Sequence, residues 1–214
     1  MKKTLSIFVA AMLLLAAVPS FAQVQIGAGY VSSSDRVRVS NNSEVESTPS
    51  NGVYGGVGFT LPLGGDLAVT PGIYYSYLTN RSASSVAGGI IAVAGEKEEH
   101  YVNVPIHFNY GANFTPKFRF FFFGGPAVSY GVISRTTLSG SILGFSANTV
   151  VDNYRDVSGY GRWDVMVGGG MGFDLVNRLR LTVGYDFGLM NRYIDGGDYY
   201  RHRQQLHAGL AFLF

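Results

Sequence analysis

The sequence predicts an all-β fold: an eight-stranded antiparallel transmembrane β-barrel, an up-and-down meander preceded by a cleavable signal peptide. Three observations support this prediction. The first residues have the layout of a secretory signal. The rest of the chain alternates with the period of two that a β-strand requires. Short and long connections alternate along the chain, which is typical of outer-membrane barrels.

The N-terminus contains the three parts of a signal peptide. Lys2 and Lys3 form a positive start, residues 5–17 are almost all apolar, and Ser20-Phe21-Ala22 places small residues where signal peptidase reads them. The apolar run is shorter than the roughly 20 residues of a spanning helix, so a retained anchor is the weaker alternative. We expect a signal peptide over residues 1–22 and an outer-membrane β-barrel over 23–214.

Charge and composition exclude several classes of protein. The chain has 16 Lys and Arg against 14 Asp and Glu, and cleavage after Ala22 would remove two lysines and leave a neutral mature chain. A neutral chain with 29 glycines and 14% aromatic residues argues against a nucleic-acid partner, a coiled coil and a disordered protein. The absence of cysteine excludes disulfides, thiolate metal sites and a cysteine nucleophile.

The first four strands are expected near residues 24–30, 53–61, 69–77 and 101–110. In each, apolar side chains take alternate positions and so share one face of the sheet. These apolar residues are Val24, Ile26, Ala28 and Tyr30, then Val53, Val57, Phe59 and Leu61, then Val69, Ile73, Tyr75 and Tyr77, then Val102, Val104, Ile106, Phe108 and Tyr110.

The last four strands are expected near residues 118–130, 162–175, 179–190 and 205–214. Their apolar faces carry Phe118, Phe120, Phe122, Val128 and Tyr130, then Trp163, Val165, Val167, Met171 and Phe173, then Leu179, Leu181, Val183, Tyr185 and Phe187, then Leu206, Leu210, Phe212 and Phe214. The opposite faces carry glycine, polar groups and charges. Glycine there is expected to let a tightly curved wall bend and to leave room for large neighbours.

The connections and the aromatic residues favour a membrane barrel over a soluble one. Short connections at 64–66, 115–117 and 176–178 alternate with long ones near 33–50, 80–97, 134–157 and 191–203. Phenylalanines gather near the short turns, and Tyr75, Tyr77, Tyr130 and Trp163 lie toward the long connections, as in the two aromatic girdles of a membrane barrel. A soluble lipocalin-like barrel would instead bury the apolar face. The strand count is open by one pair, because residues 138–151 could extend their flanking strands.

Several segments resemble the outer-membrane protein β-barrel domain family, of the PorT-like kind. They are Tyr101-Val102-Asn103-Val104-Pro105-Ile106, Phe123-Gly124-Gly125-Pro126, residues 168–174 and residues 181–189, and the resemblance runs from about Asn51 onward. The last strand carries apolar residues at alternate positions up to the final phenylalanine. This pattern is similar to the signal that such barrels present to the barrel-assembly machinery. The residues of this signal are Leu206, Leu210, Phe212 and Phe214. The resemblance implies the barrel and is nearly silent on function.

No motif for catalysis or for a cofactor stands out. Nothing in the spacing of the four histidines forces a metal site, so we expect no metal. No Ser-His-Asp spacing is evident, and we expect no enzymatic activity. The run at 168–172 lies inside a strand without the Lys-Ser/Thr and helix of a phosphate-binding loop, and we expect no cofactor.

Charged residues on the inward faces form the first candidate site. The turn at 176–178 should pair Arg180 with Asp174 across neighbouring strands, and Arg119 should lie at the same end. Asp164 and Asp186 are expected higher in the lumen. Buried charges must be paired or hydrated, so these residues predict an ion-pair network that fills a narrow barrel. A polar pore is the alternative interpretation.

The last long connection forms the second candidate site. It mixes arginine with tyrosine and could bind lipopolysaccharide phosphates or a protein partner, together with Arg36 and Arg38 of the first connection. Ordinary anchoring at the membrane rim is the alternative. The residues concerned are Arg192, Tyr193, Tyr199, Tyr200, Arg201 and Arg203.

Taken together, these features predict an integral outer-membrane protein of a Gram-negative-type cell, with both termini in the periplasm. We expect a non-enzymatic structural or interaction role, with outer-membrane lipids and the assembly machinery as partners and long surface loops as the binding region. A narrow porin-like channel for small solutes is the first alternative. A barrel enzyme acting on lipid or peptide is the second.

Overall fold

The computed structural model describes residues 22–39, 43–86, 91–142, 145–192 and 200–214. The segment on which the signal-peptide prediction rests, residues 1–21, lies outside the described residues. In the part of the chain that is described, no helix is long and apolar enough to cross a membrane.

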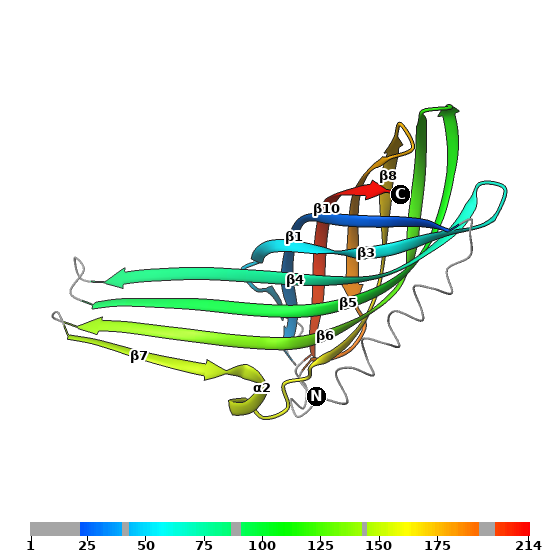
Figure 1. Ribbon diagram of the computed structural model, residues 1–214. Helices are drawn as coiled ribbons and strands as arrows, with labels where there is room; N and C mark the ends of the chain where they lie inside the picture. The colour runs from blue at the N-terminus through cyan, green and yellow to red at the C-terminus, as the bar shows by residue number, and fades with distance from the viewer. Residues whose placement is uncertain (1–21, 40–42, 87–90, 143–144, 193–199) are drawn as a thin grey trace, which may run out of the picture.

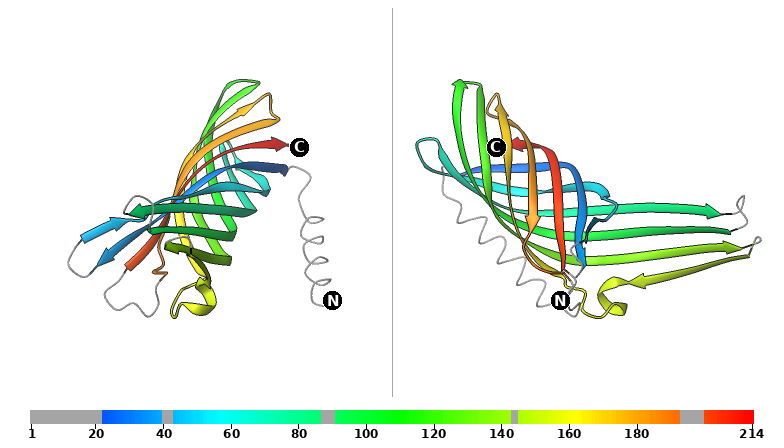
Figure 2. Two further views of the ribbon diagram at one scale, coloured as in Figure 1. Left: turned by 90° about the vertical axis from the view of Figure 1, so that its left-hand side faces the viewer. Right: turned by 180° about the vertical axis from the view of Figure 1, so that it is seen from behind.

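Eight antiparallel strands form a closed ring, which confirms the predicted fold class (Figures 1 and 2). They are β1 (Gln23–Val39), β3 (Ser50–Gly64), β4 (Leu67–Val86), β5 (Ile91–Thr115), β6 (Phe118–Ile142), β8 (Trp163–Leu175), β9 (Leu179–Gly188) and β10 (Tyr200–Leu213). Each strand pairs with the next one in the ring, and β10 closes it on β1 from Gln25↔Leu213 to Arg38↔Tyr200. Closure leaves no open edge within the wall, as a sheet in lipid requires.

In the described residues, the long connections near 33–50 and 80–97 are largely strand rather than loop, which corrects the sequence prediction, and residues 138–151 extend the flanking strands as the sequence allowed. β4 and β5 stay paired out to Val86↔Ile91, and β5 and β6 stay paired out to Ile91↔Ile142. Two further strands, β2 (Ser43–Glu46) and β7 (Phe145–Asp152), pair with β1 and β6 outside the ring. The sheet β4–β5–β6–β7 therefore projects far beyond the ring, and the short helix α2 (Asn153–Asp156) follows it (Figure 1). We call this extension the projecting sheet.

The short connections are tight turns at one end of the barrel. The turn between β8 and β9 holds Val176 and Asn177 at positive φ (54° and 56°), and the turn between β3 and β4 uses Gly64 and Gly65 at 114° and 59°. Two successive residues with positive φ match the twist of a two-residue hairpin. We call this the short-turn end and the opposite one the long-hairpin end.

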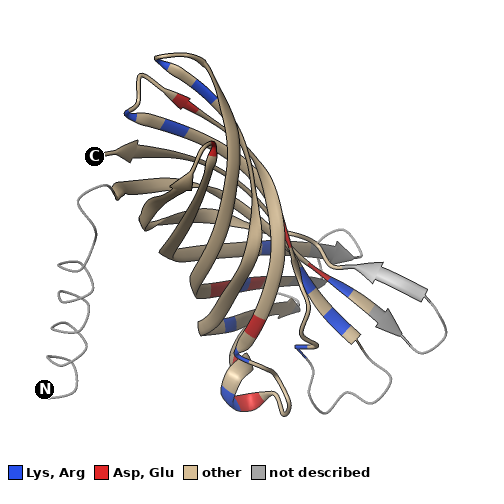
Figure 3. Ribbon diagram, turned by 90° about the vertical axis from the view of Figure 1, so that its right-hand side faces the viewer, with Lys and Arg blue, Asp and Glu red and all other residues tan. Residues whose placement is uncertain are grey.

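The predicted apolar faces point outward. Trp163 is 59% exposed, and the alternating apolar residues of β8, β9 and β10 are exposed in the same way. Phe118, Phe120 and Phe173 pack ring to ring near the short-turn end, whereas Tyr130 packs on Trp163 at a centroid distance of 4.7 Å toward the long-hairpin end. Charges lie toward both ends of the wall, with few between them (Figure 3). An exposed apolar belt between aromatic girdles is the surface that lipid requires.

The lumen is more aromatic than the sequence predicts. Phe121 and Phe123 are buried inside the barrel, and so are Tyr101, Leu78 and Met166. β6 therefore carries phenylalanine on both faces, and its run of four consecutive phenylalanines at 120–123 hid the inward pair. The lumen is filled by large side chains, as an eight-stranded barrel allows.

Inward glycines make room for these aromatic rings. A Cβ atom on Gly170 would lie 2.0 Å from the carbonyl oxygen of Val183 and 2.8 Å from Cζ of Phe123. On the outward face, a Cβ on Gly55 would meet nothing closer than 3.6 Å. Small residues on β8 are thus a packing requirement of the narrow lumen.

This packing generates a matched pair of variants. We expect Gly170→Ala to destabilise the barrel by about 1–3 kcal/mol, because the added methyl group overpacks the wall and Phe123. Gly55→Ala should change stability by less than about 0.5 kcal/mol. Urea unfolding in micelles, with the gel shift between unheated and boiled samples as a check of folding, measures both. Equal effects of the two substitutions would contradict the packing argument.

Candidate functional site in the barrel lumen and at its mouth

A buried arginine crosses the lumen near the short-turn end. Arg180 on β9 donates from Nε and Nη2 to both carboxylate oxygens of Asp174 on β8, at 2.7 and 2.9 Å. Its Nη1 donates to Gln25 on β1 at 2.9 Å and to Thr60 on β3 at 3.1 Å. A fork of this kind fixes both ions in a single geometry. Arg180 thus ties four strands together across the lumen.

Arg119 and Phe121 complete this lower cluster. Arg119 lies 3.8 Å from Asp174 and donates to the carbonyl oxygen of Asp66 at 3.1 Å. The guanidinium groups of Arg180 and Arg119 lie 4.7 and 5.7 Å from the ring centroid of Phe121. The cluster therefore combines ion pairing with cation–π contacts.

A small cavity of about 110 Å³ lies in the middle of the lumen. Asp186 and His207 face each other across 3.4 Å, and Tyr54, Tyr74 and His107 also line the cavity. Among the described residues, no group of three His, Cys, Asp or Glu side chains could hold a metal ion. A cavity of this size with several polar side chains in its lining has room for ordered water.

A second arginine crosses the lumen toward the long-hairpin end. Arg203 on β10 is 1% exposed and lies 3.8 Å from the ring centroid of Tyr101 on β5. It donates to Ser33 on β1 at 2.9 Å and to Ser129 on β6 at 3.1 Å. Arg203 therefore connects strands on opposite sides of the ring, as Arg180 does at the other end.

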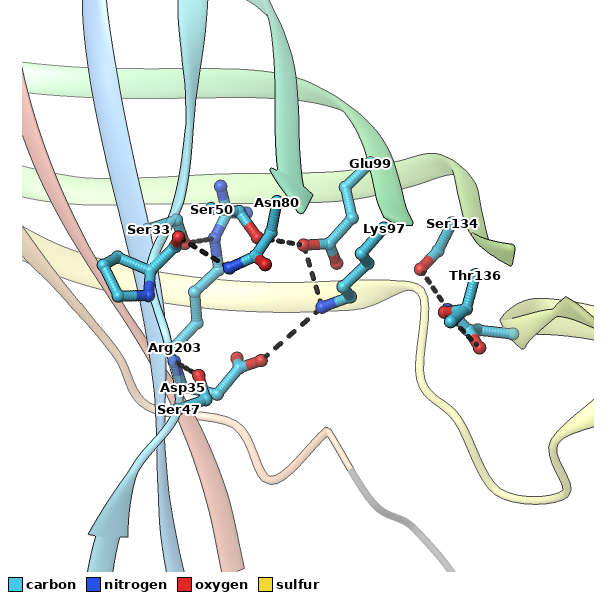
Figure 4. A network of polar contacts seen from close by, with 12 residues as sticks. Ser33, Asp35, Ser47, Ser50, Asn80, Lys97, Glu99, Ser134, Thr136 and Arg203 are labelled. Carbon is cyan, nitrogen blue, oxygen red and sulfur yellow. Dashed lines mark hydrogen bonds and ion pairs between the residues drawn. The ribbon is translucent and has the colours of Figure 1, made fainter. Parts of the chain in front are cut away.

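Above Arg203, a cluster of charges closes the mouth of the barrel. Arg192 donates to the hydroxyl of Tyr101 at 2.8 Å and to Asp35 at 3.3 Å. Arg201 bonds the other oxygen of Asp35. Lys97 pairs with Glu99 at 2.9 Å (Figure 4). We call Asp35, Lys97, Glu99, Arg192 and Arg201 the mouth cluster.

Asp35 is the shared anion of the mouth cluster. Burial alone would raise the pKa of its carboxyl group, but the charges of Arg192, Arg201 and Lys97 outweigh burial and hold the pKa well below its usual range. Asp35 therefore stays ionised at any physiological pH.

A polar cleft of about 390 Å³ opens above the mouth cluster at the base of the projecting sheet. One wall comes from β1 and the 47–50 segment, and the other from β4, β5 and β6. Asn80 joins the two walls by donating to the carbonyl oxygens of Thr48 and Pro49, at 3.1 and 2.8 Å. Figure 4 shows the floor of the cleft with Lys97, Glu99 and Asp35.

The predicted charge network divides into separate groups. Arg119, Asp174 and Arg180 come together at the short-turn end, with Arg180 opposite Asp174 in the strand register. Asp186 lies beside His207 in the middle of the lumen. Asp164 is buried at the start of β8 and forms no ion pair with the other four residues, all of which are described. The structure therefore does not join these five residues into one network.

Three arginines of the predicted loop site are placed differently from the prediction. Arg192 and Arg203 are buried, and Arg201 is half-buried against Asp35, so these residues are occupied in closing the barrel. The correction has a physical reason: β10 begins at Tyr200, so the inward side of the strand carries Arg203 into the lumen. Tyr200 is exposed, as is Arg36 on β1. Tyr193, Tyr199 and the side chain of Arg38 lie outside what is described.

Sequence reasoning missed Asp35, Lys97, Glu99 and Tyr101. All four continue the inward positions of their strands, Asp35 after Val31 and Ser33 on β1 and the other three before Asn103 on β5. The alternation itself was the available signal. Asp35, Lys97 and Glu99 lie beyond the strand ends that the thickness of a membrane predicts, whereas Tyr101 lies at the start of an expected strand.

Three residues of the predicted assembly signal lie on the outward face of β10, and Phe214 follows directly after the strand. Leu206, Leu210, Phe212 and Phe214 are all exposed, and Phe212 and Phe214 pack ring to ring at 4.9 Å. Their role in assembly stays a prediction.

The outer rim carries one hydrogen-bonded chain of polar side chains. The hydroxyl of Tyr75 lies 2.5 Å from Nδ1 of His100, whose Nε2 lies 2.9 Å from Glu98. Tyr77 packs on the same imidazole at 5.0 Å. The arrangement lies within the upper aromatic girdle, where amphipathic rings anchor a barrel at the water interface.

Comparison with known proteins identifies a family. The model of the outer membrane protein beta-barrel domain matches residues 19–193. The PorT-like subtype stays a prediction. No curated protein sequence matches the chain.

Among solved structures, the chain is similar to small outer-membrane barrels. It shares 14% identity and a TM-score of 0.44 with the attachment invasion locus protein Ail of Yersinia pestis in complex with the heparin analogue sucrose octasulfate, over 90% of this chain and 99% of that one. It shares 12% identity and a TM-score of 0.42 with Neisserial surface protein A, over 90% and 97%. With the N-terminal barrel domain of Pseudomonas aeruginosa OprF it shares 13% identity and a TM-score of 0.34, over 90% and 97%.

The mouth cluster predicts that removing the charge of Asp35 lowers the stability of the barrel strongly. Asp35→Asn leaves Arg192 and Arg201 without their shared anion in a buried site, and we expect a loss of about 3 kcal/mol in the free energy of unfolding. Glu96→Gln is the matched control, because Glu96 pairs with an Arg81 side chain that is 78% exposed. We expect this substitution to lower the free energy of unfolding by less than about 1 kcal/mol. Urea unfolding in micelles measures both. A loss below 1 kcal/mol for Asp35→Asn would contradict the role of the cluster.

The pH dependence of this contribution has a defined sign. The folded pKa of Asp35 lies below its unfolded value near 4, so its stabilisation is complete above about pH 4 and is lost as the pH falls toward the folded pKa. We expect the difference in unfolding free energy between the natural chain and Asp35→Asn to be constant from about pH 8 to about pH 5 and to shrink below about pH 4. Urea unfolding at each pH tests this. A difference that shrank already near pH 6 would point to a histidine instead.

Proposed function

Because the chain belongs to the outer membrane protein beta-barrel domain family, we propose that it is a non-conducting, non-enzymatic outer-membrane protein of structural or interaction type. Its partners meet it at the long-hairpin end, on the projecting sheet and around the mouth. Its exposed apolar belt contacts outer-membrane lipids, and the outward face of β10 serves as the signal to the assembly machinery.

One observation carries the proposal: two buried arginines cross the lumen at different heights. Arg180 bonds groups on β1, β3 and β8, and Arg203 bonds groups on β1 and β6 while lying on Tyr101 of β5. Each is paired or hydrogen-bonded on several sides, so moving it would leave a buried charge without partners. A lumen closed twice in this way favours a structural or interaction role over a channel.

The proposed orientation is supported by the connections. Outer-membrane barrels place short turns in the periplasm and long connections outside the cell. The start of β1 pairs with the end of β10 at the short-turn end, which would put both chain ends in the periplasm. A barrel domain over 23–214 that follows a cleaved signal peptide over 1–22 agrees with this orientation. The projecting sheet then faces the outside.

The projecting sheet provides the surface for interaction. Its edge strands β4 and β7 each keep one side without a sheet partner beyond the ring in the described residues. Arg36 and Tyr200 are exposed near the mouth and add charge and an aromatic anchor. These features support contact with a protein or with lipopolysaccharide.

The enzyme alternative would require a positioned nucleophile and base. The rim chain of Tyr75, His100 and Glu98 comes nearest to that arrangement among the described residues. Its hydroxyl is a phenol that lies in the aromatic girdle, where anchoring residues are common. This supports an anchoring role, and the proposal remains non-enzymatic.

Conductance decides between the proposal and the channel alternative. We expect the folded chain in planar lipid bilayers to give no ion-conducting steps, because both arginine layers close the lumen. A general porin is the positive control. Stable steps from the unmodified chain would replace the proposal with the channel.

A further inference from the structure

The cleft above the mouth cluster has the size of a ligand site. Its volume of about 390 Å³ lies within the ~300–1,000 Å³ of most small-ligand pockets. Its position between the projecting sheet and β1 leaves it open at the long-hairpin end, above the closed lumen. The chemistry of its walls indicates what it can hold.

The charged side chains of the cleft are already paired with one another. Lys97 bonds Glu99 at 2.9 Å and lies 3.9 Å from Asp35, which also binds Arg201. Glu96 pairs with Arg81 at 2.8 Å. A charged ligand would compete with the pairs of Asp35 and Glu99, and a buried ion that loses its partner costs several kcal/mol. The cleft is therefore poorly suited to a charged ligand.

The remaining polar groups are hydroxyls and amides. Ser82, Thr48 and Thr136 line the two walls with Asn80 and Asn153. Asn80 Nδ2 is taken by Thr48 and Pro49, and Asn153 donates to Thr136, so the acceptor oxygens and the hydroxyl groups are what a ligand can use. A hydroxyl group donates one hydrogen bond and accepts others, and an amide does both. Such groups suit a ligand that is itself uncharged and carries many hydroxyls.

Apolar surface lies beside these polar groups. Leu138 on β6 is half-exposed, and Val157 and Tyr160 line the cleft next to α2. A sugar ring presents hydroxyls along its edge and C–H groups on its faces, so it needs both kinds of surface. An extended peptide would instead need a free strand edge, and the floor strand β5 is paired on both sides here, by Asn80↔Lys97 and Lys97↔Thr136.

We propose that this cleft binds an uncharged oligosaccharide. The ligand lies between the β1 wall and the projecting sheet, with its hydroxyls on Ser82, Asn80 and Thr136 and a ring face against Leu138. The inference rests on the proposed function, since it takes the long-hairpin end as the binding surface. The sugar chain of the cell's own lipopolysaccharide and a glycan from outside the cell are two sources of the same chemistry.

The test uses the full mature chain folded in a detergent without a sugar headgroup, because a glycoside detergent would compete. The protein is applied to an array of neutral, sulfated and sialylated oligosaccharides, and to lipopolysaccharide with and without its neutral sugar chain. We expect binding to neutral oligosaccharides. Binding on the array identifies an outside glycan as a source, and binding that needs the lipopolysaccharide sugar chain identifies the cell's own.

Two variants separate the cleft from the rest of the surface. Ser82→Trp fills the cleft and should weaken neutral-sugar binding at least tenfold. Ala83→Trp is the control, since Ala83 is the next residue of β4, points to the other face of the sheet and is also exposed. The gel shift confirms that both variants fold.

The outcomes leave the inference either supported or overturned. Neutral-sugar binding that Ser82→Trp abolishes and Ala83→Trp retains supports it. Binding confined to sulfated or sialylated glycans, no binding to any neutral sugar, or equal effects of the two variants overturns it. Because the array does not report conductance, its failure leaves the proposed non-conducting role intact, whereas porin-like steps would defeat that role independently.

Discussion

Closure of the sheet in lipid is the constraint on which the rest of the structure depends. Within a bilayer no water is present to satisfy backbone amides, so β10 must pair with β1 along its whole length. Eight strands are enough to close the ring, but they leave a lumen only as wide as the side chains inside it. The choice of eight strands thus fixes both the outer surface and the filling of the interior.

The filling follows from the width of the lumen. Side chains long enough to cross it can tie opposite strands together, and arginine does this with a fork of donors that satisfies several acceptors at once. Arg180 and Arg203 use this property at two heights, each with an aromatic ring beneath its guanidinium group. Where large side chains fill the lumen, the neighbouring positions of the wall must carry small residues. Gly170 beside Phe123 is an example. The charged groups, aromatic rings and glycines of the lumen therefore depend on one another for their packing.

The sequence was sufficient for the wall and insufficient for the mouth. Alternation predicted the eight strands and their outward faces. The short turn at 176–178 fixed the pairing of the two strands beside it and so placed Arg180 opposite Asp174. The same alternation also runs through Asp35, Lys97 and Glu99, but the lipid requirement that defines strand length in sequence does not apply above the membrane. Arg192 differs again: it follows β9 in the chain yet contacts Asp35 of β1 and Tyr101 of β5. Only the closed ring brings those segments together, and no local pattern contains that information.

The same ion pairs that close the barrel also define what its mouth can recognise. Lys97, Glu99, Asp35 and Arg201 satisfy one another, so they hold the β1 wall to the projecting sheet and leave no charge unpaired in the cleft floor. Recognition then falls to hydroxyl and amide groups, whose hydrogen bonds are individually weak and depend on direction. A rigid frame compensates for weak contacts because the ligand need not order the site on binding. The same arrangement of charges therefore stabilises the mouth of the barrel and leaves the cleft suited to an uncharged ligand.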